Sequence, residues 1–190
     1  MRSPAKVRRA LESADRLPAE LFEQHRHSRS VRALATISEV GDQPQLRIAS
    51  GAMLLAGLFL RDRRLARTGV RMFLAHELAT LIKNIIKTSV DRKRPRSSTS
   101  REERKVRPGG HTGKEMTSFP SGHTAGSVAV ACAVARDYPR QTAFAYGAAG
   151  TIAVAQVPQC AHYPTDVGVG LLIGVASEAA AGMLLPACEE

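Results

Sequence analysis

The chain has 190 residues and a formal net charge of +10, because 27 Lys and Arg outnumber 17 Asp and Glu. This length fits one domain that is large enough to bury a core. Only 4% of the residues are aromatic and Trp is absent, which leaves few side chains to stack on bases. We therefore expect the positive charge to meet anionic lipid or phosphate, and we expect no nucleic acid partner.

The N-terminal residues 1–45 are expected to form a basic, amphipathic region. Apolar positions recur at near-helical spacing over residues 5–24, and a second such stretch covers residues 30–40. The second stretch ends at Gly41-Asp42-Gln43-Pro44, a sequence that breaks a helix. The rest of the chain, residues 46–190, is expected to be one helical domain.

Apolar segments, nearly free of charge, dominate that domain. They cover residues 46–60, 70–86, 123–135, 142–157 and 167–185. No alternating run typical of a strand is found, so the expected fold is all-α. The small residues of the last two segments, including Gly170 and Gly174, suit close helix packing in a bilayer. We therefore predict a multi-pass membrane bundle with about five spanning helices. None is a clean run of about 20 apolar residues, so a soluble helical bundle is the alternative.

The most informative stretch is residues 118–126, Ser-Phe-Pro-Ser-Gly-His-Thr-Ala-Gly. Pro120, Ser121 and Gly122 predict a turn, which places His123 in the first turn of a helix. Free backbone N–H groups and the positive end of the helix dipole make such a turn a natural anion site. A histidine at its edge is suited to pass protons to a bound phosphate. Taken alone, the turn is more typical of simple helix capping.

Two further motifs flank this turn. Upstream, Lys87 is followed by Arg94 and Pro95, and downstream His162 precedes Asp166 by four residues. In this order, the motifs resemble those of the phosphatidic acid phosphatase type 2 superfamily. That superfamily also includes bacterial non-specific acid phosphatases and vanadium haloperoxidases. The resemblance covers about residues 70–185.

The resemblance implies a phosphatase that works through a phosphohistidine. His162 would be the nucleophile, and Asp166 would bind its other ring nitrogen, which the spacing permits on one turn of a helix. His123 would protonate the leaving oxygen and then activate water. The substrate implied is a lipid phosphate or diphosphate, such as phosphatidate or a polyprenyl diphosphate.

The phosphate itself would be held by Lys87 and Arg94 and by the backbone of Ser121 and Gly122. No metal and no cofactor is required, since cationic side chains take the place of a metal. The resemblance also implies an integral protein of the bacterial inner membrane, in contact with membrane lipids. The oligomeric state is left open between a monomer and a homo-oligomer.

Position 156 departs from the family pattern. The resemblance implies an arginine six residues before the nucleophile, and this chain has Gln156 there. A third phosphate-binding cation is then missing, unless an arginine such as Arg92 or Arg107 replaces it. Gln156 favours one alternative, a catalytically weak or silent lipid-phosphate binder. Two others stay open: a vanadate-dependent haloperoxidase, which would share the anion site, and a nucleic-acid-binding protein, which would explain the basic loop over residues 92–114.

The side of the membrane that carries the site is also left open. All three motifs fall on one face if all five segments span. Lys and Arg are concentrated in the segments on that face, residues 1–45 and 87–121, which favours the cytoplasm. The resemblance implies the outer face of the inner membrane instead.

Overall fold

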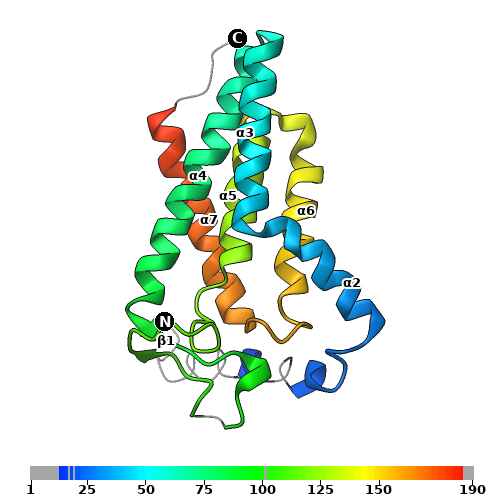
Figure 1. Cartoon of the computed structure of the whole chain (residues 1–190), viewed down its shortest axis with the longest axis vertical. Helices are drawn as coiled ribbons and strands as arrows, with labels where there is room; N and C mark the ends of the chain where they lie inside the picture. Colours follow the sequence, from blue (N-terminus) through cyan, green and yellow to red (C-terminus); the bar gives the residue numbers. More distant parts are fainter. Residues whose placement is uncertain (1–12, 17, 19, 101, 186–190) are drawn as a thin grey trace, which may run out of the picture.

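The computed structural model describes residues 13–185 apart from residues 17, 19 and 101. The main part of the molecule is a bundle of long helices that run roughly along one axis (Figure 1). They are α3 (Gln43–Leu60), α4 (Arg63–Lys87), α5 (Gly122–Asp137), α6 (Thr142–Ala155) and α7 (Pro164–Leu184). Each predicted apolar segment forms one of these helices, so the prediction of a helical bundle is confirmed.

The N-terminal region contributes α2 (Arg29–Ser38) and a short 3-10 helix, η1 (Glu39–Gly41). Together they cover the amphipathic stretch predicted over residues 30–40 and one residue on either side. The break after it is also confirmed, because α3 starts anew at Gln43 with Pro44 in its first turn, where a missing N–H costs no hydrogen bond. Part of the other predicted stretch, residues 5–24, lies outside the described residues.

A two-stranded antiparallel pair was not predicted. The strands β1 (Val90–Asp91) and β2 (Arg107–Pro108) lie in the long connection between α4 and α5. This connection also holds the 3-10 helix η2 (Pro95–Ser97), and it folds against the lower end of the bundle in Figure 1. Another short 3-10 helix, η3 (Pro139–Gln141), joins α5 to α6. Strands of two residues are too short to leave an alternating pattern in the sequence.

Small residues set the distances between the helices. Around α5, the alanines Ala125 and Ala129 are fully buried against α4 and α7. A Cβ added at Gly170 would lie 2.7 Å from the Ser121 carbonyl oxygen, and one added at Gly174 would lie 2.7 Å from the Ala125 carbonyl oxygen. The backbones of α5 and α7 therefore touch at the glycines that the sequence marked for close packing.

The polarity of the bundle is partly reversed from that of a water-soluble protein. Large apolar side chains point outward, with Phe59 88% exposed and Met183 83% exposed. Fully buried Arg71 pairs with Asp137 inside the bundle. By length and composition, α7 is the one helix among the described residues that passes as a candidate membrane span, so the prediction of five spans is not confirmed.

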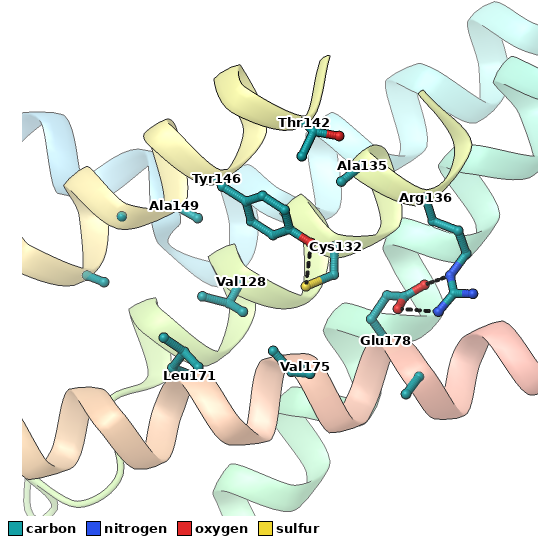
Figure 2. A pocket seen from close by; sticks show the side chains of 13 residues that line it. Val128, Cys132, Ala135, Arg136, Thr142, Tyr146, Ala149, Leu171, Val175 and Glu178 are labelled. Carbon is teal, nitrogen blue, oxygen red and sulfur yellow. Dashed lines mark hydrogen bonds and ion pairs between the residues drawn. The ribbon is translucent and has the colours of Figure 1, made fainter. Parts of the chain in front are cut away.

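A groove of about 740 Å³ opens between α5, α6 and α7. Figure 2 shows Val128, Leu171 and Val175 along it. At one end Arg136 donates to Glu178 with Nε–Oε1 2.5 Å and Nη2–Oε2 2.9 Å. The groove is thus mainly apolar along its length and ionic at the end away from the start of α5.

We predict that Gly174→Ala destabilises the bundle and that Gly168→Ala does not. The added methyl group meets backbone of α5 at position 174, whereas nothing lies within 4 Å of a Cβ at position 168 of the same helix. We expect a loss of about 1–3 kcal/mol for the first variant, and no loss for the second, since Ala favours helix over Gly. Melting in detergent measures both. Equal melting temperatures for the two variants would contradict this account of α5–α7 packing.

Candidate active site

The three sequence motifs meet at one end of the bundle. Lys87 ends α4 and His123 lies in the first turn of α5, while Asp166 lies in the first turn of α7. Arg94 comes from the α4–α5 connection and donates through Nη1 to the Ala161 carbonyl oxygen at 3.0 Å, directly beside His162. The elements that carry these residues end or begin at the lower end of the bundle in Figure 1.

His162 and Asp166 form a buried pair. The exposed fraction of the His162 side chain is 3% and that of Asp166 is 0%, and His162 Nδ1 lies 3.7 Å from Asp166 Oδ2. His162 precedes α7, whose N-cap is Tyr163, so the expectation that both residues share one helical turn is wrong. The predicted ring nitrogen does face the carboxylate. The distance of 3.7 Å between the two atoms is longer than a hydrogen bond.

The Asp166 carboxylate is held on several sides. Oδ2 accepts from Ser118 Oγ at 2.6 Å and from the Tyr163 N–H at 3.0 Å, and Oδ1 pairs with Arg92. The bond to Tyr163 also caps α7, so Asp166 fixes the start of this helix while it faces His162. The orientation of the Asp166 carboxylate therefore depends on Ser118, before α5, and on Tyr163, before α7.

Arg92 has several polar partners and is the counter-ion of Asp166. It pairs with Asp15 at 2.6 Å, donates to Thr165 Oγ1 at 2.8 Å, and lies 4.0 Å above the centre of the Tyr163 ring. Burial alone would lower the pKa of Arg92, but Asp166 and Asp15 outweigh it and raise that pKa. The N-terminal region thus reaches the site through Asp15.

Burial sets the protonation of His162. Removal from water lowers the pKa of the imidazole to about 4, an effect that Asp166 offsets only in part. The nearby cations Arg94 and Lys87 add to the decrease. His162 is therefore neutral at physiological pH, which is the form that a nucleophile needs.

The two predicted phosphate-binding cations are fixed by backbone carbonyl groups. Buried Arg94 donates through Nε to the Lys114 carbonyl oxygen at 2.8 Å, and Lys87 donates to the Thr117 carbonyl oxygen. Burial lowers the pKa of Arg94, yet a guanidinium stays charged at any physiological pH. These contacts hold both side chains beside the start of α5.

The turn at Ser121 starts α5 as predicted. Ser121 Oγ accepts from the Thr124 N–H at 3.4 Å, and the Ser121 N–H donates to the Asp166 carbonyl oxygen at 3.1 Å. The Ser121 amide is therefore already engaged, contrary to the expectation that it holds phosphate. Gly122 follows as the first residue of α5, where a backbone N–H has no partner within the helix.

The model of the PAP2 superfamily matches residues 68–185, more than half of the chain. The chain belongs to the PAP2 superfamily. A search of curated proteins finds no match. In fold, the chain is similar to LpxE from Aquifex aeolicus, with 22% identity, a TM-score of 0.64, and coverage of 86% of this chain and 91% of that one.

A second solved structure is similar over most of the chain. It is described as the first transmembrane PAP2 type phosphatidylglycerolphosphate phosphatase from Bacillus subtilis. It shares 20% identity and a TM-score of 0.68, with coverage of 92% of this chain and 86% of that one. Both comparisons support the PAP2 helical fold.

Gln156, where the resemblance implies an arginine of the PAP2 superfamily, supports His162 instead of presenting a charge. Its buried amide donates through Nε2 to the Ile152 carbonyl oxygen at 3.2 Å. The backbone carbonyl oxygen of Gln156 accepts from the backbone N–H groups of Ala161 and His162, both at 3.2 Å. The side chain is thus turned back on α6, while the backbone positions His162.

Neither arginine suggested as a substitute is available in this arrangement. Arg92 is bound by two carboxylates, as described above, and exposed Arg107 pairs with Glu102 at 3.0 Å. Further ion pairs in the same connection, such as Lys93 with Glu103 at 3.0 Å, also neutralise part of the positive charge that the nucleic-acid alternative relied on.

Lys83 also lies beside the start of α5, and this position was not predicted from the sequence. It is buried in α4, and its Nζ would lie 3.7 Å from a Cβ added at Gly122. It lies four residues before Lys87, and residues at that spacing share one face of a helix. This spacing was the available signal, but Lys83 was assigned to the interior of an apolar segment.

We predict that His162 makes the protein less stable in acid. Between about pH 6.5 and pH 4 the unfolded chain binds a proton at this ring that the folded chain does not, so stability falls as the pH decreases through this window. The expected contribution is about 3 kcal/mol. Melting temperatures of the wild type and His162→Gln across this range measure it. Parallel curves would contradict the assignment.

Proposed function

We propose that the chain removes a phosphate group from a lipid phosphate monoester or diphosphate, through a phosphohistidine at His162 and without a metal ion. One observation carries the proposal: a neutral, buried histidine is paired with a carboxylate and lies beside the cations Lys87 and Arg94. A neutral nucleophile next to fixed positive charge is the arrangement that phosphoryl transfer requires. Membership of the PAP2 superfamily supports the same chemistry.

The proposed reaction has two steps. His162 attacks the phosphorus atom in line, the bond from phosphorus to the lipid oxygen breaks, and His123 gives that oxygen a proton. His123 then takes a proton from water, whose oxygen attacks the phosphohistidine. Inorganic phosphate leaves and neutral His162 is restored. Lys87 and Arg94 stabilise the phosphoryl oxygens in both steps.

The distribution of polarity supports a membrane location. Apolar side chains cover the outside of the bundle, including Phe59, Phe144 and Leu172, while the fully buried residues include Arg71 and His76. Outward apolar and inward polar side chains are typical of a bundle surrounded by lipid. We infer that α3 to α7 all cross the bilayer of a bacterial inner membrane. The similar Bacillus subtilis protein is itself described as transmembrane.

The groove between α5, α6 and α7 supports a lipid as substrate. Its volume of about 740 Å³ and its apolar wall, with Val128 and Leu171, suit a hydrocarbon chain. Val128 is little more than one helical turn beyond His123 in α5. A lipid with its headgroup at His123 therefore has a path for one of its chains.

Gln156 favours a second candidate, a lipid-phosphate binder with little or no turnover. A charge-assisted contact that is absent costs about 1.5–3 kcal/mol. We propose that Lys83 supplies the missing charge, because its side chain packs on Gly122 at the start of the phosphate-binding turn. With Lys83, the site again has three cations.

We predict that His162→Ala abolishes release of inorganic phosphate from phosphatidate in detergent micelles, with a loss of at least about 10³-fold. Acid-labile labelling from a ³²P-labelled substrate should disappear in the same variant. His123→Ala should still take the label from an ester with a good leaving group. Exposed His27→Ala is the control. Wild-type turnover by His162→Ala would rule out the nucleophile, and lipid binding without any turnover by the wild type would favour the silent binder.

We predict that Lys83→Met weakens inhibition by vanadate, an analogue of the transition state, by roughly tenfold or more. Gln156→Arg should recover much of this loss in the Lys83→Met background and should gain less in the wild type. Lys105→Met removes an exposed lysine and is the matched control. Unchanged vanadate inhibition in Lys83→Met, with normal melting, would show that Lys83 is not part of the phosphate site.

A further inference from the structure

We propose that Asp42 is a positioning residue that holds His123 in the form that gives a proton to the leaving oxygen. The inference rests on the proposed function and adds a second carboxylate–histidine pair to the site. His123 Nε2 lies 2.8 Å from Asp42 Oδ1, which is within hydrogen-bond distance. The two residues lie far apart in the sequence, and the helix bundle brings them together.

The conformation of Asp42 is unusual for its place in the chain. It is the N-cap of α3, where an aspartate side chain normally accepts the N–H of the second or third helical residue. The Asp42 side chain makes no such bond, whereas Asp62, the N-cap of α4, accepts from the Leu65 N–H at 2.9 Å. Asp42 therefore forgoes the capping bond, and its carboxylate faces His123.

Close packing fixes the turn that carries Asp42. A Cβ added at the preceding residue, Gly41, would lie 2.6 Å from Ile152 Cγ2 of α6 and 3.7 Å from His123 Cδ2. The close approach of this turn to α6 therefore requires a glycine at position 41. One turn into α3, Leu46 is buried against Gly126 of α5. The start of α3 is thus held between α5 and α6, and it begins part-way up the bundle (Figure 1).

The other charged groups that act on His123 are positive. Partial burial of this ring opposes a proton most strongly, Asp42 is the carboxylate that favours one among the described residues, and Arg94, Lys83 and Lys114 oppose it further. A site built from cations binds phosphate well but disfavours an imidazolium. Asp42 supplies the negative charge that offsets part of this opposition to a protonated His123.

The geometry also assigns a role to each ring nitrogen. Because the edge with Nε2 and Cδ2 faces the turn at Gly41 and Asp42, Nδ1 is on the opposite edge of the ring. Nδ1 gives its proton to the leaving oxygen, and Nε2–H stays bonded to Asp42 throughout. When Nδ1 next takes a proton from water, the same bond stabilises the imidazolium that forms, as a carboxylate does for a catalytic histidine.

The test compares two substrates with purified full-length protein in detergent. Phosphatidate has an alkyl leaving group that needs a proton, and p-nitrophenyl phosphate has one that does not. In Asp42→Asn, kcat/KM should fall roughly 10- to 100-fold for phosphatidate and less than about threefold for p-nitrophenyl phosphate. kcat/KM covers only the steps up to departure of this group, so later hydrolysis of the phosphohistidine does not affect the comparison.

Three further variants separate positioning from folding. Glu39→Gln removes an exposed carboxylate three residues away and should leave both substrates unchanged. Asp42→Glu should recover part of the activity on phosphatidate. His123→Ala should show the same selective loss, and Asp42→Asn should add little to it. Equal losses for both substrates in Asp42→Asn, or no loss for either, would overturn the proposal.

A measurement that needs no turnover tests the role of Asp42 separately from the proposed phosphatase activity. In ¹⁵N spectra of histidine-labelled protein, the His123 ring should stay protonated to a higher pH in the wild type than in Asp42→Asn, with Glu39→Gln like the wild type. Identical His123 titrations in all three proteins would overturn the role of Asp42. A normal difference with no phosphate release from any ester would instead leave the pair in place and contradict the phosphatase.

Discussion

The carboxylate of Asp166 is the group on which the geometry of the site depends. It accepts hydrogen bonds from Ser118 and from the backbone of Tyr163, pairs with Arg92, and faces His162. These partners come from the α4–α5 connection and from the start of α7. A buried carboxylate without them would be strongly disfavoured, and so would a buried Arg92 without its acids. The interactions that stabilise the buried Asp166 carboxylate therefore also hold the three motifs together.

This arrangement also needs the helices to approach closely, and the small residues of α5 and α7 permit it. The backbone of Gly170 lies against Ser121, at the turn that precedes His123. A side chain at position 170 would push that turn away from Asp166, whose carbonyl oxygen accepts from the Ser121 N–H. Packing inside the bundle and the geometry of the site are thus set by the same contact. A bundle with small and polar residues inside and apolar residues outside can maintain this contact between α5 and α7 in lipid.

The sequence allowed prediction of the helices and of the end of the bundle where the motifs meet. Both follow from local patterns: apolar segments give helices, and their alternating direction puts Lys87, His123 and His162 on one face. The contacts of Asp42 and Asp15 could not be predicted in this way, because each joins residues far apart in the chain and leaves no periodic signal. The two-residue strands could not be predicted for a related reason, since so short a strand has too few residues to show an alternating pattern. Lys83 was detectable from its spacing to Lys87, but the apolar residues around it concealed it.

The proposed mechanism needs a neutral His162 and a protonated His123, and the surroundings of the two rings differ. A nucleophile must be neutral, and His162 is almost fully buried beside Arg94 and Lys87, which disfavour a proton. The proposed general acid must be protonated, and His123 is 29% exposed with its Nε2 2.8 Å from Asp42 Oδ1. The proposed mechanism relies on this difference in surroundings to combine acid and nucleophilic chemistry in one site. Each histidine has its own carboxylate, but Asp166 is itself neutralised by Arg92, whereas among the described residues no Lys, Arg or His other than His123 pairs with Asp42. That difference in the second partner distinguishes the two carboxylate–histidine pairs, to which the proposed mechanism gives different roles.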